Sequence, residues 1–557
     1  MNKLERTMVQ HYQAQVCVIG AGPVGLTLAM DLAQRGIQVL ITEMRYRGEA
    51  PNVKCNHVSA RTMEIFRRLG IAKAVRQAGL PADYPNDVAY KTRFLGQELA
   101  RIGIPCRRER YTAMQGPDTG WPTTEPPHRI NQIYLEPVLF EAAAQHGNIT
   151  ILNRTQALEF IENSNNCEVK AINLDSNEEI KIRADFIVGC DGGRSAVRRI
   201  IGAKLNGTAE IGKVQSTCIR APELIQHLQD KPAWATFSVN PQRSGNVYAI
   251  DGKEIWLVHN YLNPGEDDFD AVDRDQSIRH ILGVDQSFQY EVISKEDWTA
   301  RRLVADIFRK GRMFICGDAA HLWVPMAGYG MNAGIADAMN LSWTLAAYLN
   351  GWAGEKILDV YQIERQPITD QVSNFAMNHA IALHKHRQEI PENIEEDSKE
   401  GKQSRDMFGR ILYELNVRQY CCSGLNFGYF YDQSLVIFYD QEQAPAYDMN
   451  AFVSSTVPGC RTPHFFLENG ASLYDCLGPE YTLLCFDSAV PESFISTAAE
   501  YGFPITILNL PDITEEQAAL GYKTKYVLTR PDQHTAWRGE TLPPQPENFF
   551  AQLAGRA

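Results

Sequence analysis

The stretch Val16–Glu43, VCVIGAGPVGLTLAMDLAQRGIQVLITE, decides the fold of this chain. A short apolar run leads into the pattern GAGPVG at residues 20–25, a helical pattern follows, and a second apolar run ends in Glu43. In this strand–helix–strand context a GxGxxG pattern predicts a dinucleotide site. Gly20 permits a tight turn, Gly22 lets the backbone approach a pyrophosphate, and Gly25 lets the helix pack closely on the strand. The stretch therefore predicts a Rossmann-like α/β domain.

The same stretch predicts how the nucleotide is held. The N-terminus of the helix after Gly22 offers amide donors and the positive end of a dipole to phosphates. Glu43 stands at the end of the second strand, where a carboxylate can accept hydrogen bonds from a ribose. A chance glycine cluster in a structural turn is the alternative, and the flanking strand, helix and acid argue against it. The pattern alone does not separate NAD from FAD.

Two later segments favour FAD. FIVGCDGGRSAVRR (residues 186–199) and GRMFICGDAAHLWVPMAGYGMNAGIADAMNLSW (residues 311–343) each begin with an apolar strand that ends near an aspartate, Asp191 or Asp318. Ligands of α/β folds bind at such strand ends. A long helix is predicted from about Ala333, and its N-terminus favours an anion, such as the N1/C2=O edge of a reduced flavin, by up to about 2 kcal/mol. A strand-terminating turn or a helix cap would explain either segment alone. All three together indicate a flavin monooxygenase rather than a nicotinamide dehydrogenase.

Bulk properties exclude several classes of protein. A chain of 557 residues is too long for a single hydrophobic core, and this length predicts about three or four domains. The net charge of −13 argues against nucleic acid or an anionic membrane as a partner. The sequence shows neither a long apolar span nor the apolar core of a signal peptide. Twelve cysteines without a CxxC pair indicate reduced thiols in a cytoplasmic protein, with no metal cluster.

Over nearly its whole length the chain resembles the class A FAD-dependent aromatic hydroxylases, in particular the phenol and dichlorophenol hydroxylase branch. The segments PNVKCNHVSARTMEIFRRLG (residues 51–70) and INQIYLEPVLFEAA (residues 130–143) add to this resemblance. Ala327 departs from it, because the family has a glycine there. The resemblance implies these FAD-binding residues: Gly20, Gly22, Pro23, Val24, Gly25, Glu43, Met44, Arg45, Lys54, Gln132, Asp191, Asp318, Pro325, Gly328, Gly330, Met331 and Asn332.

The resemblance also implies an α/β domain organisation. A discontinuous Rossmann-like FAD-binding domain of the para-hydroxybenzoate hydroxylase type is expected at residues 1–75, 100–205 and 305–395. A β-sheet substrate domain is expected at residues 76–99 and 206–304, with strands near 233–241, 245–250 and 254–262. A linker or helical region (396–444) and a thioredoxin-like domain without CxxC (445–557) follow. The polar segment 384–410 is expected to be a solvated loop or helix face, with a mobile lid as the alternative.

By resemblance, the function is that of a monooxygenase. It would use NADPH, or NADH, and O2 to hydroxylate a small phenolic or aromatic substrate through a flavin C4a-hydroperoxide, and it would be a homodimer. A tailoring monooxygenase or epoxidase on a polycyclic aromatic substrate is one alternative. A non-catalytic flavin-binding protein is another.

Such a reaction needs water to be excluded and a group that accepts or orients the phenol proton. Asn56 stands about where phenol hydroxylase has a carboxylate, and an amide can orient a phenol without taking its proton. His57 has a pKa suited to the task, unless it only packs or touches the FAD edge. His259 and Tyr261 share one face of a predicted strand, with Tyr248 on the strand before. These three are further candidates, with ordinary sheet packing as the alternative.

Overall fold

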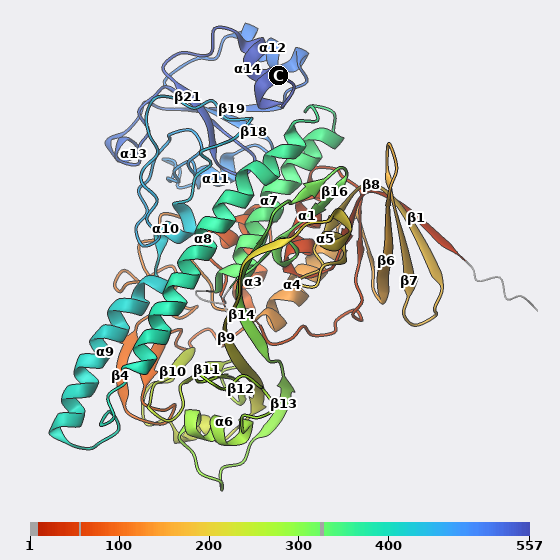
Figure 1. Cartoon of the computed structure of the whole chain (residues 1–557). Helices are drawn as coiled ribbons and strands as arrows, with labels where there is room; N and C mark the ends of the chain where they lie inside the picture. The colour runs from red at the N-terminus through yellow and green to blue at the C-terminus, as the bar shows by residue number, and fades with distance from the viewer. Residues whose placement is uncertain (1–8, 55–56, 324–327) are drawn as a thin grey trace, which may run out of the picture.

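The computed structural model describes residues 9–54, 57–323 and 328–557, and it contains three β-sheets (Figure 1). The first sheet has the order β15-β16-β8-β1-β2-β5, with β7 paired to β8 and β6 to β7. Its strands are β1 Gln10–Ile19, β2 Val39–Thr42, β5 Ile149–Leu152, β6 Thr155–Glu162, β7 Cys167–Asn173, β8 Glu179–Gly189, β15 Arg309–Lys310 and β16 Met313–Ile315.

Parallel pairing brings the three segments of the sequence to one sheet edge. Ile19 at the end of β1 lies opposite Thr42 of β2 and Gly189 of β8. Gly189 in turn lies opposite Ile315 at the end of β16. The turns that follow β1, β8 and β16 therefore meet, as expected for ligand sites at the carboxyl ends of parallel strands.

Helices cover this sheet. They are α1 Pro23–Gln34, α2 Ala60–Arg68, α3 Ala72–Gln77, α4 Gln132–Ala144, α5 Ala196–Ile201, α7 Tyr329–Leu349 and α8 Ile357–Gln388. Helix α7 packs along α1, and both are almost wholly buried. The prediction that α7 begins near Ala333 is wrong by about one turn. Gly328 adopts a left-handed conformation (φ 65°) as the N-cap, and the helix starts directly after it.

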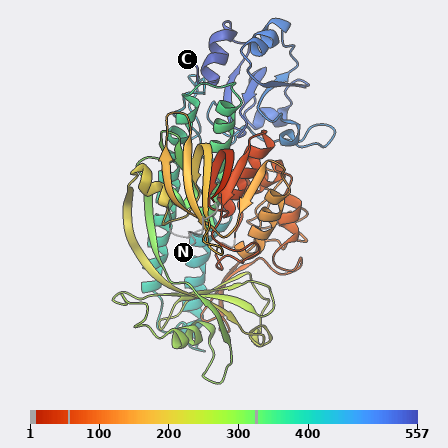
Figure 2. The ribbon, with the colours of Figure 1, turned by 90° about the vertical axis from the view of Figure 1, so that its right-hand side faces the viewer.

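The second sheet has the order β17-β14-β9-β12-β11-β10-β3-β4, with β13 also paired to β9. Its strands are β3 Val88–Lys91, β4 Glu98–Ile102, β9 Leu205–Arg220, β10 Ala235–Ser238, β11 Gly245–Ala249, β12 Ile255–Tyr261, β13 Glu291–Lys295, β14 Trp298–Ala305 and β17 His321–Leu322. The three strands predicted for residues 233–262 are confirmed as β10–β12. Long β9, yellow in Figure 2, curves from beside the first sheet into the second. Three short helices accompany these strands: α6 Arg274–Leu282, η1 Leu224–His227 and η2 Gly317–Ala319.

The polar segment 384–410 contributes to two long helices, the end of α8 and the start of α9 Lys399–Tyr420. Helix α9 packs on β4 so closely that a side chain at Gly409 would collide with the carbonyl of Leu99. Figure 1 shows α8 reaching from beside the third sheet down to the second. The segment is thus largely helical and lies beside the second sheet, and many of its polar side chains are exposed.

The third sheet, of order β19-β18-β20-β21, closes the chain. It consists of β18 Tyr481–Phe486, β19 Ile505–Leu510, β20 Tyr526–Thr529 and β21 Thr535–Gly539, with helices α10 Ser423–Phe427, α11 Leu473–Cys476, α12 Glu492–Glu500, α13 Glu515–Ala519 and α14 Pro546–Leu553 nearby. A fully buried ion pair between Arg530 and Glu364 ties this part to α8. Its assignment as thioredoxin-like stays a prediction. None of the helices in the described residues is both long and apolar enough to cross a membrane.

Candidate functional site

A cavity of about 750 Å³ lies between the first and second sheets. One wall is made of the turns that follow β1, β8 and β16 and of the start of α7. The other wall is the inner face of the second sheet, with the end of α9. The cavity therefore joins the predicted cofactor residues to the predicted substrate residues. Those on its lining are Gly22, Pro23, Val24, Lys54, His57, Gln132, Tyr248, His259, Tyr261, Asp318, Gly328, Gly330 and Met331.

The glycines of this wall fit a dinucleotide. A Cβ at Gly20 would lie 2.5 Å from the carbonyl oxygen of Cys190, and a Cβ at Gly25 would lie 2.1 Å from that of Gly20. Both glycines are therefore needed for packing. A Cβ at Gly22 or Gly330 would instead meet no protein atom within 4 Å. These two positions keep open space beside the backbone, as a closely approaching cofactor requires.

Two helix N-termini open into the same cavity. Helix α1 begins after Gly22 and α7 after Gly328, and these glycine N-caps have no side chain that could accept hydrogen bonds from the first amides of the helix. Their first amides are thus available as donors to an anionic ligand. A Cβ at Gly328 would lie 2.9 Å from the Cβ of His57, so the left-handed glycine also lets the two segments meet.

Glu43 ends a chain of polar contacts beside the first turn. One carboxylate oxygen accepts from the amide of Ala21 at 2.8 Å and the other from the side chain of Arg45 at 3.1 Å. Arg45 also donates to Glu136 at 2.8 Å, and Glu136 accepts from Gln132 at 2.5 Å. The chain fixes the Glu43 carboxylate at the strand end. Met44 is exposed beside it.

The two strand-end aspartates differ in environment. Asp318 is exposed on the cavity lining, and its carboxylate has no hydrogen-bond partner among the described residues. The Asp191 carboxylate instead caps α5, accepting from the amides of Ala196 at 2.6 Å and Val197 at 3.3 Å. Asp191 itself does not line the cavity, whereas its neighbours Cys190, Gly192, Gly193 and Arg194 do. Of the two aspartates, Asp318 is therefore the one that lies on the cavity lining without a hydrogen-bond partner among the described residues.

Two further predicted residues hold protein segments together. Asn332 accepts from the amide of Ser59 at 2.8 Å and donates to the carbonyl of His57 at 3.1 Å, which fastens α7 to the start of α2. Lys54 forms an ion pair of 2.6 Å with Glu296, and both residues line the cavity. Asn56 and Pro325 lie outside the described residues.

The inner face of the second sheet presents aromatic side chains to the cavity. Tyr248, His259 and Tyr261 lie on this face, as their strand alternation predicts. The ring of His259 contacts Tyr248 at 5.4 Å and Trp298 at 5.9 Å between centroids. Burial lowers the pKa of His259 to about 4, so its imidazole is neutral at physiological pH. Asn246 donates to the hydroxyls of Tyr261 at 2.8 Å and Tyr248 at 3.2 Å.

His57 lies at the junction of the two walls, in contact with a residue that sequence analysis missed. Its Nδ1 contacts the guanidinium of Arg129, which also lines the cavity. Burial, and then the positive charge of Arg129, hold the pKa of His57 well below its usual range. This environment opposes proton uptake by His57. Arg129 stands three residues before Gln132, and that proximity was the available sequence signal.

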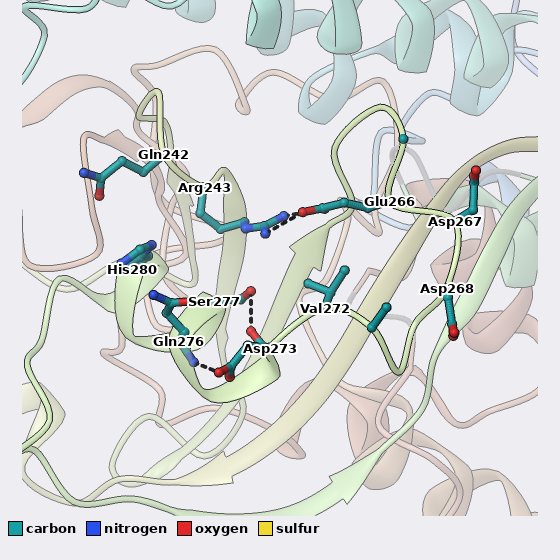
Figure 3. A pocket seen from close by; sticks show the side chains of 12 residues that line it. Gln242, Arg243, Glu266, Asp267, Asp268, Val272, Asp273, Gln276, Ser277 and His280 are labelled. Atoms are coloured by element: carbon teal, nitrogen blue, oxygen red, sulfur yellow. Dashed lines mark hydrogen bonds and ion pairs between the residues drawn. The ribbon is translucent and has the colours of Figure 1, made fainter.

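A second hollow, of about 630 Å³, lies at the outer end of the second sheet and α6 (Figure 3). Three of its charged groups already have partners. Arg243 forms a two-pronged ion pair with Glu266 at 2.7 and 2.8 Å, and Asp273 caps α6 through the amide of Gln276. Gln242 and His280 also line the hollow and are labelled in Figure 3. The hollow presents no aromatic wall and does not include the predicted cofactor residues.

Known proteins resemble the chain over almost its full length. The FAD-dependent monooxygenase apdD of Emericella nidulans is 29% identical over 97% of this chain and 90% of its own. Phenol 2-monooxygenase of a Pseudomonas species is 27% identical over 98% of this chain and 93% of its own. The structure of the rebeccamycin biosynthetic enzyme RebC with reduced flavin superposes with a TM-score of 0.88, at 29% identity, over 98% of this chain and all of that one.

A family model described as an FAD binding domain matches residues 13–376, which is more than half of the chain and includes all three segments around the cavity. The resemblance to FAD-dependent aromatic hydroxylases and the FAD-binding α/β fold are confirmed. The chain therefore belongs to the FAD-binding-domain family, and its cofactor is FAD.

Proposed function

We propose that this chain is an FAD-dependent monooxygenase that uses NAD(P)H and O2 to hydroxylate a small phenolic or aromatic compound. One observation carries the proposal: a single cavity combines a cradle suited to a dinucleotide with a wall of aromatic side chains. Relatives over the full chain length include phenol 2-monooxygenase and 2,4-dichlorophenol 6-monooxygenase.

The geometry of the cavity supports the following roles for residues that would hold FAD. The backbone at Gly22 and the start of α1 would bind the phosphates, and Glu43 would bind the adenosine ribose. Asp318 would accept from the ribitol, and the start of α7 would face the flavin. When bound, FAD supplies the redox chemistry that NAD(P)H and O2 require. The protein contributes position, polarity and protection from water.

The second sheet would hold the substrate ring. Aromatic side chains give a flat compound a large apolar contact area. The hydroxyls of Tyr248 and Tyr261 both accept from Asn246, so each retains its own proton for donation to an oxygen of the substrate. The neutral imidazole of His259 can accept a hydrogen bond from a phenol in return. These side chains orient the ring and stabilise charge that develops on its oxygen.

Turnover tests the proposal directly. FAD-loaded protein would be incubated with NADPH and a panel of phenols, hydroxybenzoates and polycyclic phenols, with NADPH use, H2O2 and product mass scored together. We expect at least one compound to accelerate NADPH oxidation and gain one oxygen atom. Slow oxidation that ends only in H2O2 with every compound would favour a non-catalytic flavin protein. Because an epoxide and a hydroxylated product have the same mass, NMR of the product would distinguish them, and an epoxide would favour the epoxidase alternative.

A matched pair of variants tests the substrate wall. His259→Leu removes a polar group from the cavity, whereas His280→Leu changes a histidine at the rim of the second hollow. We expect His259→Leu to raise the share of H2O2 while FAD content stays unchanged, and His280→Leu to behave as the wild type. Equal product yields for both variants would remove His259 from the site.

We further propose that the protein is a cytoplasmic homodimer, as the family resemblance implies. Light scattering after size exclusion would then give about twice the chain mass of 62.7 kDa. A mass of one chain across a range of concentrations would contradict the dimer.

A further inference from the structure

Arg129 is a buried cation in the cavity wall. Its side chain is 4% exposed and lines the cavity just before α4. Among the described residues, none supplies a carboxylate within ion-pair distance of its guanidinium. The acid with the largest influence on it is Asp118, which is already paired with Arg110 at 2.6 Å. The positive charge of Arg129 is therefore not neutralised locally.

The contacts that hold Arg129 are all with neutral groups. Its guanidinium lies over the ring of Trp234, 4.8 Å from the centroid, and 5.6 Å from that of Tyr420. It donates to the carbonyl of Tyr420 at 3.4 Å and contacts Nδ1 of His57. Since a guanidinium can only donate, His57 must accept at Nδ1 and is neutral there. These contacts fix the orientation of the guanidinium but do not compensate its charge.

The arginines that are buried at least as deeply as Arg129 have a different environment. Arg365, Arg461 and Arg530 are no more exposed than Arg129, and each pairs with a carboxylate. Burying an unpaired charge is costly. Burial lowers the pKa of Arg129, yet a guanidinium starts so high that it stays protonated at neutral pH. An anionic ligand in the cavity would supply the missing partner.

The neighbours of Arg129 place it on the substrate side. Trp234 immediately precedes β10, and Tyr420 ends α9. Both line the cavity opposite the glycine turns of the first sheet. A planar guanidinium that stacks on Trp234 is suited to a planar anionic group lying against the same aromatic wall.

We propose that Arg129 binds an anionic oxygen of the aromatic substrate, either a carboxylate or an ionised phenol. This inference rests on the proposed function in one respect: it assumes that an aromatic substrate occupies this part of the cavity. It narrows the substrate class to aromatic acids and acidic phenols. It also makes His57 a positioning residue that orients Arg129.

Binding to the FAD-loaded enzyme, without NAD(P)H, tests the proposal independently of turnover. Flavin absorbance would be followed during titration with matched pairs: 2-naphthoic acid against 2-naphthamide, and 2-naphthol against 2-methoxynaphthalene. The wild type should bind the acidic member of at least one pair more tightly. Arg129→Gln should weaken that binding by at least about tenfold and change the neutral member by less than about twofold, since a charge-assisted contact is lost.

Two further variants control the result. Arg129→Lys keeps the positive charge and should retain part of the preference for the acidic ligand. This variant also tests the proposal if Arg129→Gln folds poorly. Arg108→Gln removes an exposed arginine that does not line this cavity and should bind as the wild type does. A carboxylate ligand would show a dissociation constant independent of pH near neutrality. A phenolate ligand would bind more tightly as pH rises toward the pKa of the free phenol.

Two outcomes would overturn the proposal. One is a wild-type enzyme that binds the acids no better than their neutral partners. The other is an Arg129→Gln variant whose affinity falls equally for both ligands of a pair, or falls for neither. Because no step of the test needs hydroxylation, failure of the proposed function would appear separately, as acid binding without product.

Discussion

Gly22 and Gly25 stand three residues apart in one motif, yet the structure assigns them opposite roles. A methyl group at Gly25 would lie 2.1 Å from the carbonyl oxygen of Gly20, inside the protein. A methyl group at Gly22 would meet no protein atom within 4 Å and would project into space that we assign to the cofactor. Gly25→Ala should therefore damage the fold, and Gly22→Ala should damage FAD binding.

The magnitudes follow from these distances. Relief of the Gly25→Ala contact needs about 1 Å of movement between α1 and the end of β1, and overpacking of this kind costs about 1–3 kcal/mol. Gly22 has φ −75° and ψ 179°, which alanine adopts without strain. The apoprotein should therefore keep its stability or gain up to about 1 kcal/mol from the stiffer unfolded chain. Displaced phosphates would lose amide contacts worth at least about 1.4 kcal/mol, or tenfold in FAD affinity.

Both variants would be measured as apoprotein and with FAD. Thermal unfolding of the apoproteins reports the fold, and flavin fluorescence during titration reports the dissociation constant. We expect a lower melting temperature for Gly25→Ala and an unchanged or higher one for Gly22→Ala, with FAD affinity reduced at least tenfold in Gly22→Ala. Wild-type affinity in Gly22→Ala would refute the placement of the phosphates at this turn. An unaltered melting temperature in Gly25→Ala would refute the packing argument.

Three more outcomes follow from charged groups. His259 has a pKa of about 4 in the fold against about 6.5 in an unfolded chain, so the stability it contributes is present above pH 6.5 and lost as pH falls toward 4. Near pH 5, the His259→Gln variant should therefore have lost up to about 2 kcal/mol less stability than the wild type has. Melting temperatures that fall equally with pH in both proteins would contradict this. Asp318 is exposed on the cavity lining, so its charge contributes little to the stability of the apoprotein. Asp318→Asn should leave the melting temperature of the apoprotein unchanged while lowering FAD content, and an unchanged FAD content would argue against its role. Glu364→Gln leaves Arg530 with one carboxylate fewer in a fully buried site and should cost about 3 kcal/mol. On the same helix, Asp370→Asn breaks a surface pair and should cost less than about 1 kcal/mol, as urea unfolding of both variants would show.

Backbone placement was predictable from the sequence where repeating rules govern it. The strand ends near Gly20, Cys190 and Cys316 meet because parallel strands in one sheet align their carboxyl ends. The cavity-facing side chains His259 and Tyr261 follow from the two-residue period of a strand. The start of α7 was missed by a turn, because a helix can begin at a left-handed glycine that leaves no polar cap in the sequence.

Side-chain partners were not predictable, because they come from residues distant in sequence. Asp191 and Asp318 both follow apolar strands, yet one caps α5 and the other faces the cavity, and nothing within either segment distinguishes them. His57 shows the same limit more sharply. Its ordinary pKa suggests a base for a phenol, but folding places Arg129 against it and reverses the argument.

The position of Arg129 has a consequence for how such a site can work. A histidine base must be neutral before the reaction and charged afterwards, and a buried site penalises that change. A fixed cation avoids the penalty, since it stabilises an anionic oxygen without itself changing charge. With His57 and His259 both held neutral and Arg129 charged, the cavity is suited to receive an oxygen that is already ionised. The acidity would then reside in the substrate, and solvent would take the proton before the ring enters the aromatic wall.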